Sequence, residues 1–266
     1  MDMLASVKGA WVVILGASSG MGRATALAMA KEGANIFGVH LSTAAQQAEV
    51  EELVADLEAL GVQVAFRNRN AASDRNRAEL VAEIAELTGP GGVRVLLHSL
   101  AFGSLLPFIP TEEQPDVITP RQMNMTADVM GHSLVYWTRD LYVAGLLPAG
   151  AKVFTLTSHG DEHAMPSYGA VGAAKAALCA HVRQLAVELA PSGVAVNALR
   201  AGMSPTPAAL RIPGSEDLAR RAAEVNPHGR ITEPEEVAEA IVMLSASTSS
   251  WLTGNVIGVD GGEAIV

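Results

Sequence analysis

Tyr168 and Lys175 are the residues whose types and spacing most clearly suit chemistry, since seven positions separate them within residues 166–175. Seven helical residues turn through about 700°, so both side chains fall on one face of a helix, about 10 Å apart along its axis. The cation could lower the pKa of the phenol, or hold a ligand while the phenol donates to a developing oxyanion. A packed ring beside a solvated amine is the alternative for such a pair, so its surroundings must decide.

Composition narrows the classes of partner. The chain has 266 residues, 49% of them hydrophobic, which is enough for one large core and one α/β domain. Its formal net charge is −10 with only 18 Lys and Arg, whereas nucleic acid and anionic membranes require a basic surface. A small molecule is therefore the expected partner.

The single cysteine, Cys179, allows no internal disulfide and lies in an apolar helical segment. A reduced, buried thiol is expected there. The N-terminal residues lack a basic region leading into an apolar one, and the run 11–17 is too short to span a bilayer. We therefore expect a cytoplasmic protein with no membrane association.

Short apolar runs alternate with longer amphipathic runs along the chain. Strands are predicted at 11–15, 35–40, 62–66, 93–98, 152–157, 194–199 and 256–259. Helices are predicted at 22–31, 46–60, 75–87, 128–143, 168–189 and 234–244. This alternation, with little polar patterning in the strands, predicts an α/β fold: a Rossmann-type doubly wound parallel sheet of about seven strands with helices on both faces. Residues 1–266 are predicted to form a single domain.

The helix at 168–189 is predicted to present Tyr168 at the carboxyl edge of the sheet. Ser167 is a candidate N-cap, and residues 191–193 are expected to close the far end. Two irregular stretches, 103–120 and 201–228, are the expected places for a pocket wall, and the second is the predicted substrate loop.

A glycine-rich turn follows the first strand directly. Gly16, Gly20 and Gly22 permit a tight turn with close backbone approach, and the helix that follows aims its N-terminal amides at a pyrophosphate. This GxxxGxG spacing resembles the nucleotide turn of the short-chain dehydrogenase/reductase superfamily.

The resemblance extends along nearly the whole chain. Asn70 and Ala71 match the place of an acidic residue and an amide near the adenine, and residues 256–262 resemble the last strand and turn. Lys175 looks like the lysine that holds the nicotinamide ribose, and Ser158, seventeen residues earlier, falls at the position of the active-site serine. The resemblance implies cofactor contacts from Gly16, Ser18, Ser19, Gly20, Met21, Gly22, His40, Asn70, Ala71, Ser99, Leu100, Ala101, Lys175, Gly202, Ser204 and Thr206.

The position of the tyrosine separates this chain from the standard members, which place it four residues before the lysine, where this chain has Val171. A tyrosine seven residues before the lysine resembles the enoyl-acyl carrier protein reductases, which reduce a carbon-carbon double bond. Segments 98–102, 127–129, 164–166 and 201–206 resemble that branch as well. The resemblance implies catalytic roles for Tyr168, Lys175 and Ser158, and reduction of an enoyl thioester in fatty acid synthesis or related acyl metabolism.

Ser158 keeps a second activity open. Many enoyl reductases carry another tyrosine at this position, whereas the ketone-reducing members carry serine, so reduction of a ketone, ketoacyl thioester or enone is the alternative. A nicotinamide-sensing protein without turnover is a third hypothesis, although such a protein would not need the phenol.

The cofactor is expected to be NADP(H), with NAD(H) as the alternative. An acidic residue usually ends the second strand where the adenosine ribose is unphosphorylated, but this chain has His40, followed by Leu-Ser-Thr. Residues 159–163 contain two histidines and two carboxylates, yet no metal is expected, since they lack a matching third element. The expected partners are an acyl thioester, an acyl carrier protein and further copies in a homotetramer.

Overall fold

The computed structural model describes residues 7–266, and within them the chain forms one seven-stranded sheet in the order β3-β2-β1-β4-β5-β6-β7. Neighbouring strands pair in parallel throughout. The strands are β1 (Trp11–Leu15), β2 (Asn35–His40), β3 (Val64–Asn68), β4 (Val93–His98), β5 (Lys152–Thr157), β6 (Ala195–Ala201) and β7 (Val256–Val259). The α/β class and the seven-stranded parallel sheet are confirmed, and the third strand lies two residues later than predicted.

The sheet is apolar on both faces because helices cover both. In β1, Val13 and Leu15 join one core cluster, whereas Val12 and Ile14 join the cluster on the opposite face. Alternate residues of a strand point to opposite faces, so a continuous apolar run is what a doubly covered strand requires.

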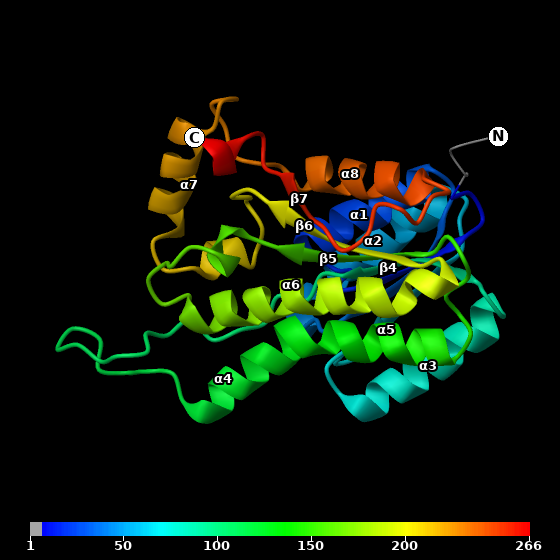
Figure 1. Cartoon of the computed structure of the whole chain (residues 1–266), viewed down its shortest axis with the longest axis horizontal. Helices are drawn as coiled ribbons and strands as arrows, with labels where there is room; N and C mark the ends of the chain where they lie inside the picture. Colours follow the sequence, from blue (N-terminus) through cyan, green and yellow to red (C-terminus); the bar gives the residue numbers. More distant parts are fainter. Residues whose placement is uncertain (1–6) are drawn as a thin grey trace.

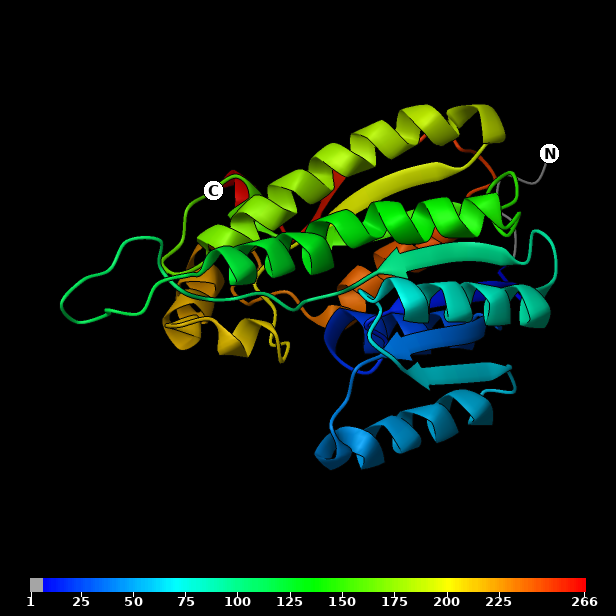
Figure 2. The ribbon, with the colours of Figure 1, turned by 90° about the horizontal axis from the view of Figure 1, so that it is seen from below.

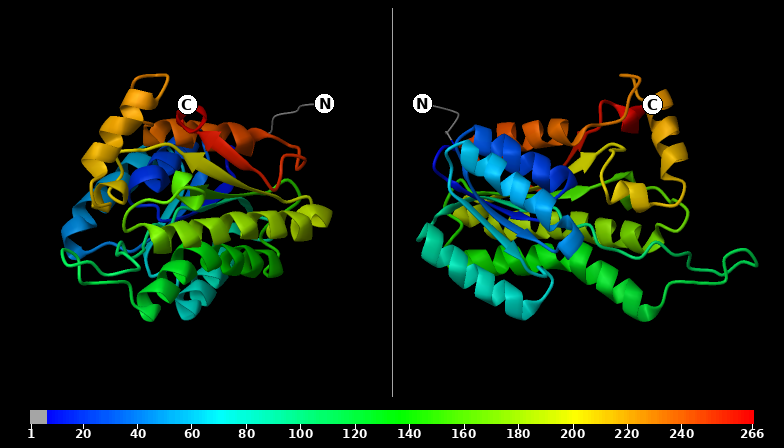
Figure 3. Two further views of the ribbon diagram at one scale, coloured as in Figure 1. Left: turned by 60° about the vertical axis from the view of Figure 1, so that its left-hand side comes forward. Right: turned by 180° about the vertical axis from the view of Figure 1, so that it is seen from behind.

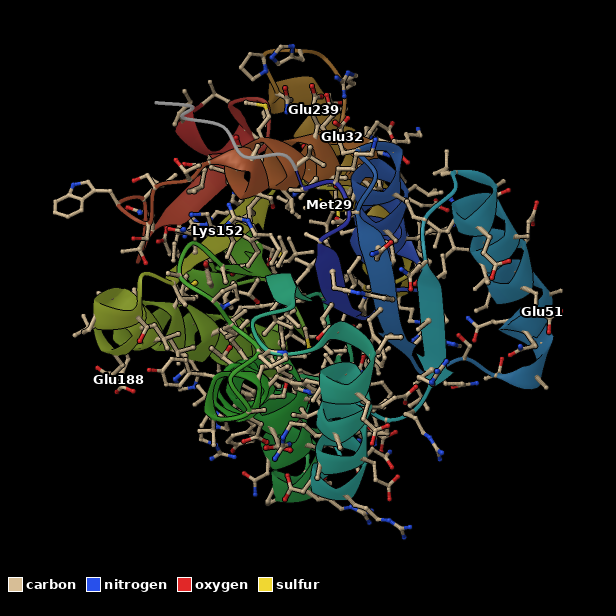
Figure 4. All side chains as sticks on the ribbon, turned by 90° about the vertical axis from the view of Figure 1, so that its right-hand side faces the viewer. Met29, Glu32, Glu51, Lys152, Glu188 and Glu239 are labelled. Atoms are coloured by element: carbon tan, nitrogen blue, oxygen red, sulfur yellow. The ribbon has the colours of Figure 1, made fainter. Side chains whose placement is uncertain are left out.

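The helices form the two outer layers (Figures 1 and 2). One layer contains α1 (Gly20–Lys31), α2 (Gln47–Ala59) and α8 (Pro234–Ala246), and the other contains α3 (Asp74–Thr88), α4 (Pro120–Ala127), α5 (Ser133–Val143) and α6 (Gly169–Leu189). Figure 4 looks along the sheet from the start of the strands: Met29 of α1 is buried, and Glu51 of α2 and Glu188 of α6 point outward from opposite layers. The buried apolar residues of the amphipathic helices therefore face the sheet, and charged residues such as Glu51 and Glu188 face solvent.

Three local predictions were wrong. The helix predicted at 128–143 begins earlier, at Pro120, where Thr119 and Gln122 form a capping box; a π-helical turn, Asp128–His132, joins α4 to α5. The stretch 201–228 is not wholly irregular, because it contains α7 (Ser215–Val225). Ser167 is not the N-cap of α6: Tyr168 occupies that position, and Ser167 has a positive φ of 59°.

All strands end at the same edge of the sheet, on the left in Figure 1. The strand order reverses direction between β1 and β4, and ligands of doubly wound sheets bind in the crevice at such a point. The long connection between β4 and α4 extends past this edge, and α7 stands beside it (Figures 2 and 3). The fold therefore gathers the predicted site residues at one end of the molecule.

Candidate active site

The hydroxyl groups of Ser158 and Tyr168 meet at the carboxyl end of β5, with 3.3 Å between Oγ and the phenolic oxygen. Tyr168 is 8% exposed, and its ring lies against the backbone of Gly160, where an added Cβ would collide with it. The next close approach is between Gly172 and the carbonyl of Gly160, which an added Cβ would contact at 2.5 Å. Glycines at these two positions thus allow the loop after β5 to pack closely on the start of α6.

Lys175 lies further along the same helix and is buried to 7% exposure. Its Nζ donates a hydrogen bond of 2.6 Å to the carbonyl of Leu156 in β5. Burial lowers the pKa of Lys175 to about 8, while Cys179 and, to a smaller extent, the charge of Asp161 oppose that shift. The amine is therefore fixed against β5, the strand that Ser158 directly follows.

The surroundings of the phenol keep it protonated at neutral pH. Burial raises the pKa of Tyr168 above its ordinary value, with a further upward contribution from Asp161, and the hydrogen bond to Ser158 acts in the opposite direction. The ring belongs to a small apolar cluster with Met130, Val171 and Ala174. A protonated phenol at an apolar surface can donate to an oxygen that becomes negative during a reaction.

The nucleotide turn has the close backbone approaches that its glycines predict. An added Cβ at Gly16 would strike the carbonyl of Ser99, and one at Gly22 would strike the carbonyl of Gly16. Gly20, with φ of 52°, would place a Cβ 3.2 Å from the side chain of Thr206. The turn after β1, the end of β4 and the loop after β6 therefore line one cradle, which suits a dinucleotide.

Ser19 is the N-cap of α1, and Met21 lies in its first turn. The first backbone N–H groups of a helix have no partner within it, so this end of α1 is suited to a pyrophosphate. Ser18 lies beside the end of β2: the hydroxyl of Ser42 donates to that of Ser18 over 3.3 Å and is 2.9 Å from Nδ1 of His40. His40 is buried and its pKa is lowered by burial, which makes it a neutral support for Ser42.

Asn70 and Ala71, the residues predicted to lie near the adenine, form hydrogen bonds within the protein. The side-chain oxygen of Asn70 accepts from the amide of Ala72 at 2.9 Å, and the carbonyl of Ala71 accepts from Trp137 Nε1 at 2.9 Å. Asn70 thus shapes the turn after β3. The structure explains its type by this turn, independently of any adenine contact.

The remaining predicted cofactor residues lie at the ends of β4 and β6. The amide of Ser99 donates to the carbonyl of Leu15 at 2.8 Å, and Leu100 and Ala101 follow it along the crevice. Beyond β6, the hydroxyl of Ser204 donates to the carbonyl of Gly202 at 3.1 Å. Both segments face the turn that contains Gly16 and Gly20, so the predicted residues are brought together.

His98, at the end of β4, is a buried neutral imidazole. Burial and the charge of Lys175 lower its pKa to about 3. Ser133 donates its own hydrogen to the carbonyl of Val129, so the 2.7 Å contact with His98 is donated by Nε2 of the ring. His98 therefore binds the first residue of α5 as a neutral imidazole.

Sequence reasoning missed two residues that the fold places beside Tyr168. Phe108, from the connection between β4 and α4, lies with its ring on the backbone of Gly169, where an added Cβ would collide with it. Asp161 is buried below Ser158 and accepts a hydrogen bond of 2.8 Å from Thr157. The only sequence signal for Asp161 was a carboxylate four residues after a buried strand, within the segment 159–163.

Among residues 7–266, no group of three or more His, Cys, Asp or Glu is placed to hold a metal ion.

Comparison with known proteins identifies the family. The family model described as enoyl-(acyl carrier protein) reductase matches residues 16–263. The chain belongs to this family. The family falls within the short-chain dehydrogenase/reductase superfamily of nicotinamide-dependent oxidoreductases, so the predicted superfamily, its resemblance to enoyl reductases and the nicotinamide cofactor class are confirmed.

Individual relatives of this enoyl reductase family member include two reaction types. The enoyl-(acyl carrier protein) reductase (NADH) of Aquifex aeolicus is 35% identical over 179 residues, covering 66% of this chain and 64% of that one, less than two thirds of its length. The 3-oxoacyl-(acyl carrier protein) reductase of Thermotoga maritima is 28% identical over 259 residues, covering 97% and 99% of the two chains. The crystal structure of the A. aeolicus enoyl reductase matches with a TM-score of 0.83 at 26% identity, covering 98% of this chain and 99% of that one.

The helices in the described part of this family member, residues 7–266, do not combine the length and the apolar character needed to cross a membrane.

Proposed function

We propose that the protein is an enoyl-thioester reductase that uses a reduced nicotinamide cofactor. The observation that carries the proposal is the placement of Tyr168. Its hydroxyl stands at the start of α6, two turns before the buried Lys175, in a chain of the enoyl reductase family. The ketone-reducing members of the superfamily carry tyrosine four residues before the lysine, whereas this chain has the buried Val171 at that position.

The proposed reaction follows from where negative charge collects. When bound, the reduced nicotinamide supplies a hydride to the β-carbon of a trans-2-enoyl thioester, and the thioester oxygen becomes an enolate oxygen. Tyr168 donates a hydrogen bond or its proton to that oxygen, and Lys175 holds the nicotinamide ribose and adds positive potential. Ser158 supports the phenol through the 3.3 Å contact between their hydroxyls.

The acyl part of the substrate is proposed to lie on the apolar cluster around Tyr168. Partly buried Leu105, Met165 and Ile212 pack against this cluster, and they come from the connection after β4, the loop after β5 and the segment before α7. These three segments, one of which belongs to the proposed substrate loop at 201–228, meet at the cluster that contains Tyr168. Apolar lining with one polar end is what an acyl thioester requires.

Ketone reduction is the second candidate, and one observation favours it. Ser158 shares the pocket with Tyr168, and a serine paired with a tyrosine can hold a carbonyl oxygen as well as an enolate oxygen. The similarity of the T. maritima 3-oxoacyl reductase over 97% of this chain fits this alternative. Replacing Ser158 with Ala distinguishes the two: a larger loss on ketoacyl than on enoyl thioesters is expected if the serine acts on ketones alone.

NADPH is the proposed cofactor, with NADH as the alternative. The segment after β2 places the hydroxyls of Ser18 and Ser42 side by side and has no carboxylate to repel a 2′-phosphate. The A. aeolicus relative carries NADH in its name, so a direct comparison is needed. Initial rates with the two cofactors at equal concentration decide between them.

The proposed substrates are tested with a panel of enoyl thioesters, 3-ketoacyl thioesters and simple ketones, each on coenzyme A and on acyl carrier protein, with nicotinamide oxidation as the readout. The kcat/KM for enoyl thioesters should exceed that for ketoacyl thioesters by about tenfold or more. A reversed order would establish the ketone reductase. Faster turnover of the carrier-linked substrates would support acyl carrier protein as the partner, and the mass in solution tests the proposed homotetramer.

A further inference from the structure

Asp161 is a buried carboxylate that joins three structural elements next to the active site. Its side chain is 2% exposed, and it accepts hydrogen bonds from Thr157 Oγ1 at the end of β5 (2.8 Å) and from Cys179 Sγ in α6 (3.2 Å). From β6, Nη2 of Arg200 lies 3.0 Å from its Oδ1. An anion this deeply buried must have compensating charge nearby, and Arg200 supplies it.

The pair formed by Asp161 and Arg200 is not fully satisfied as a structural contact. Within residues 7–266, Asp161 Oδ1 and Arg200 Nε have no hydrogen bond of good geometry, although both are buried. The remaining contact of Arg200 is to Glu162, 2.7 Å away and 61% exposed. Incompletely paired buried ions contribute little to stability, so stability alone does not explain this pair.

The carboxylate lies close to both proposed catalytic groups. Cys179, its thiol donor, is one helical turn after Lys175 on the same face of α6. Thr157, its hydroxyl donor, follows Leu156, whose carbonyl accepts from Lys175. The ring of Tyr168 packs on Gly160, the residue before Asp161.

We propose that Asp161 and Arg200 are positioning residues that set the charge of the active-site face: the buried carboxylate keeps Lys175 cationic and Tyr168 a protonated donor, and Arg200 limits the strength of that effect. The inference rests on the roles proposed for Tyr168 and Lys175. It goes beyond them because neither Asp161 nor Arg200 touches the reacting atoms.

The other charged or titratable groups around Lys175 do not perform this role. His98, from β4, is neutral because burial and the charge of Lys175 lower its pKa to about 3. Cys179 would raise the pKa of Lys175 only as a thiolate, and burial raises the pKa of Cys179 itself to about 11, so the thiol is neutral at the pH where Lys175 loses its proton. Glu162 is exposed to solvent and touches Arg200 rather than the lysine. Asp161 is thus the buried anion among these groups, and its charge raises the pKa values of Lys175 and Tyr168.

The sign of each substitution follows. Asp161→Asn keeps the shape and removes the anion, so Lys175 should lose its proton at lower pH, and the loss of activity at high pH should begin about one pH unit earlier. Arg200→Gln leaves the anion uncompensated, so the pKa of Lys175 should rise. The descending limb of the pH profile, where activity is lost, should then move to higher pH. Two variants of one contact that move the limb in opposite directions cannot be explained by loosened packing, which would affect both alike.

Two readouts separate this inference from the proposed function. The first is kcat/KM against pH on whichever panel substrate reacts fastest. The second is the dissociation constant of the reduced nicotinamide against pH without substrate, which depends on Lys175 even if no enoyl thioester is reduced. Failure to reduce enoyl thioesters would remove the proposed reaction and leave the second readout intact.

Glu162→Gln is the matched control, because it removes the same charge one residue away at an exposed position; the limb should not move. Asp161→Glu retains the anion and should restore the wild-type limb. The double variant Asp161→Asn/Arg200→Gln should move the limb downward by less than Asp161→Asn alone, and it decides the matter if a single variant does not fold. Limbs that stay in place, or that move in the same direction in both single variants, would overturn the inference.

Discussion

The phenolic oxygen of Tyr168 lies 3.3 Å from Oγ of Ser158, and this contact depends on a third residue, Gly160, in the loop between β5 and α6. Gly160 provides the flat backbone on which the tyrosine ring rests. Because the ring is held from below, its hydroxyl is directed to the end of β5, where Ser158 begins the loop. The two hydroxyls therefore lie close enough together to donate to one oxygen atom, as the proposed reaction requires.

Replacing Tyr168 with Phe should lower kcat by about 10²- to 10³-fold, since it removes a donor to the developing oxyanion. The ring remains, so nicotinamide affinity and the melting temperature should change little. Tyr142→Phe is the control: this exposed tyrosine bonds Ser192 at the other end of the molecule. Steady-state rates of the two variants decide the role, and an unchanged rate for Tyr168→Phe would remove the phenol from the mechanism.

Gly160→Ala should displace the ring of Tyr168, because the added Cβ would overlap it. Overpacking of this kind costs about 1–3 kcal/mol of unfolding free energy and should also reduce kcat. At Gly258 an added Cβ would meet its nearest neighbour at 3.7 Å, an ordinary contact, so Gly258→Ala is the matched control. Urea unfolding of both variants measures the difference, and equal stabilities would show that the glycine is not required for packing.

Activity should fall above about pH 8, because burial lowers the pKa of Lys175 to about 8. The ordinary pKa of lysine is about 10.4, so the protonated amine, which we propose holds the ribose, is lost at lower pH than in a solvated lysine. The profile of kcat/KM for the nicotinamide reports this ionisation in the free enzyme.

Lys152 provides a control for that profile. Burial lowers the pKa of Lys152 to about 8 as well, but this residue begins β5 and bonds Ser249, away from the site. Lys152→Met should leave the descending limb in place. If the limb moved with this substitution, its assignment to Lys175 would be wrong.

Ser42→Asp should shift cofactor use toward NADH by about tenfold or more, since a carboxylate beside Ser18 accepts from a ribose 2′-hydroxyl and repels a 2′-phosphate. Ser42→Ala separates the loss of the hydroxyl from the gain of charge and should move the ratio much less. The ratio of kcat/KM for NADPH and NADH is the measurement. An unchanged ratio in Ser42→Asp would place the phosphate elsewhere.

Much of the fold was predictable because its signals are local. A continuous apolar run encodes the strand β1. The turn from Gly16 to Gly22 is encoded by its glycines, because close backbone contacts leave no room for a Cβ at Gly16 or Gly22. The helix α4 also had a local signal, the Thr119–Gln122 capping box that spans Pro120, but the low apolar content of the helix concealed it. Gly214, with φ of 75°, precedes α7, whose strongly amphipathic pattern was overlooked within the long stretch 201–228.

The proposed catalytic pair, Tyr168 and Lys175, was predicted from its spacing along the chain, whereas the residues that support the pair were not. Asp161 and Arg200 are 39 positions apart in the chain and meet only because β5 and β6 are neighbours in the sheet. Phe108 reaches Gly169 from a long connection without a repeating pattern. Such contacts depend on tertiary structure, and no local pattern of residues encodes them.

The most direct test of enoyl reduction follows the hydride itself. A reduced nicotinamide carrying deuterium at its transferable position is mixed with equal amounts of a trans-2-enoyl and a 3-ketoacyl thioester, and the products are analysed by mass spectrometry and NMR. We predict one deuterium at the β-carbon of a saturated acyl thioester. Deuterium on the carbinol carbon of a 3-hydroxyacyl thioester, with the enoyl thioester unconsumed, would contradict the account.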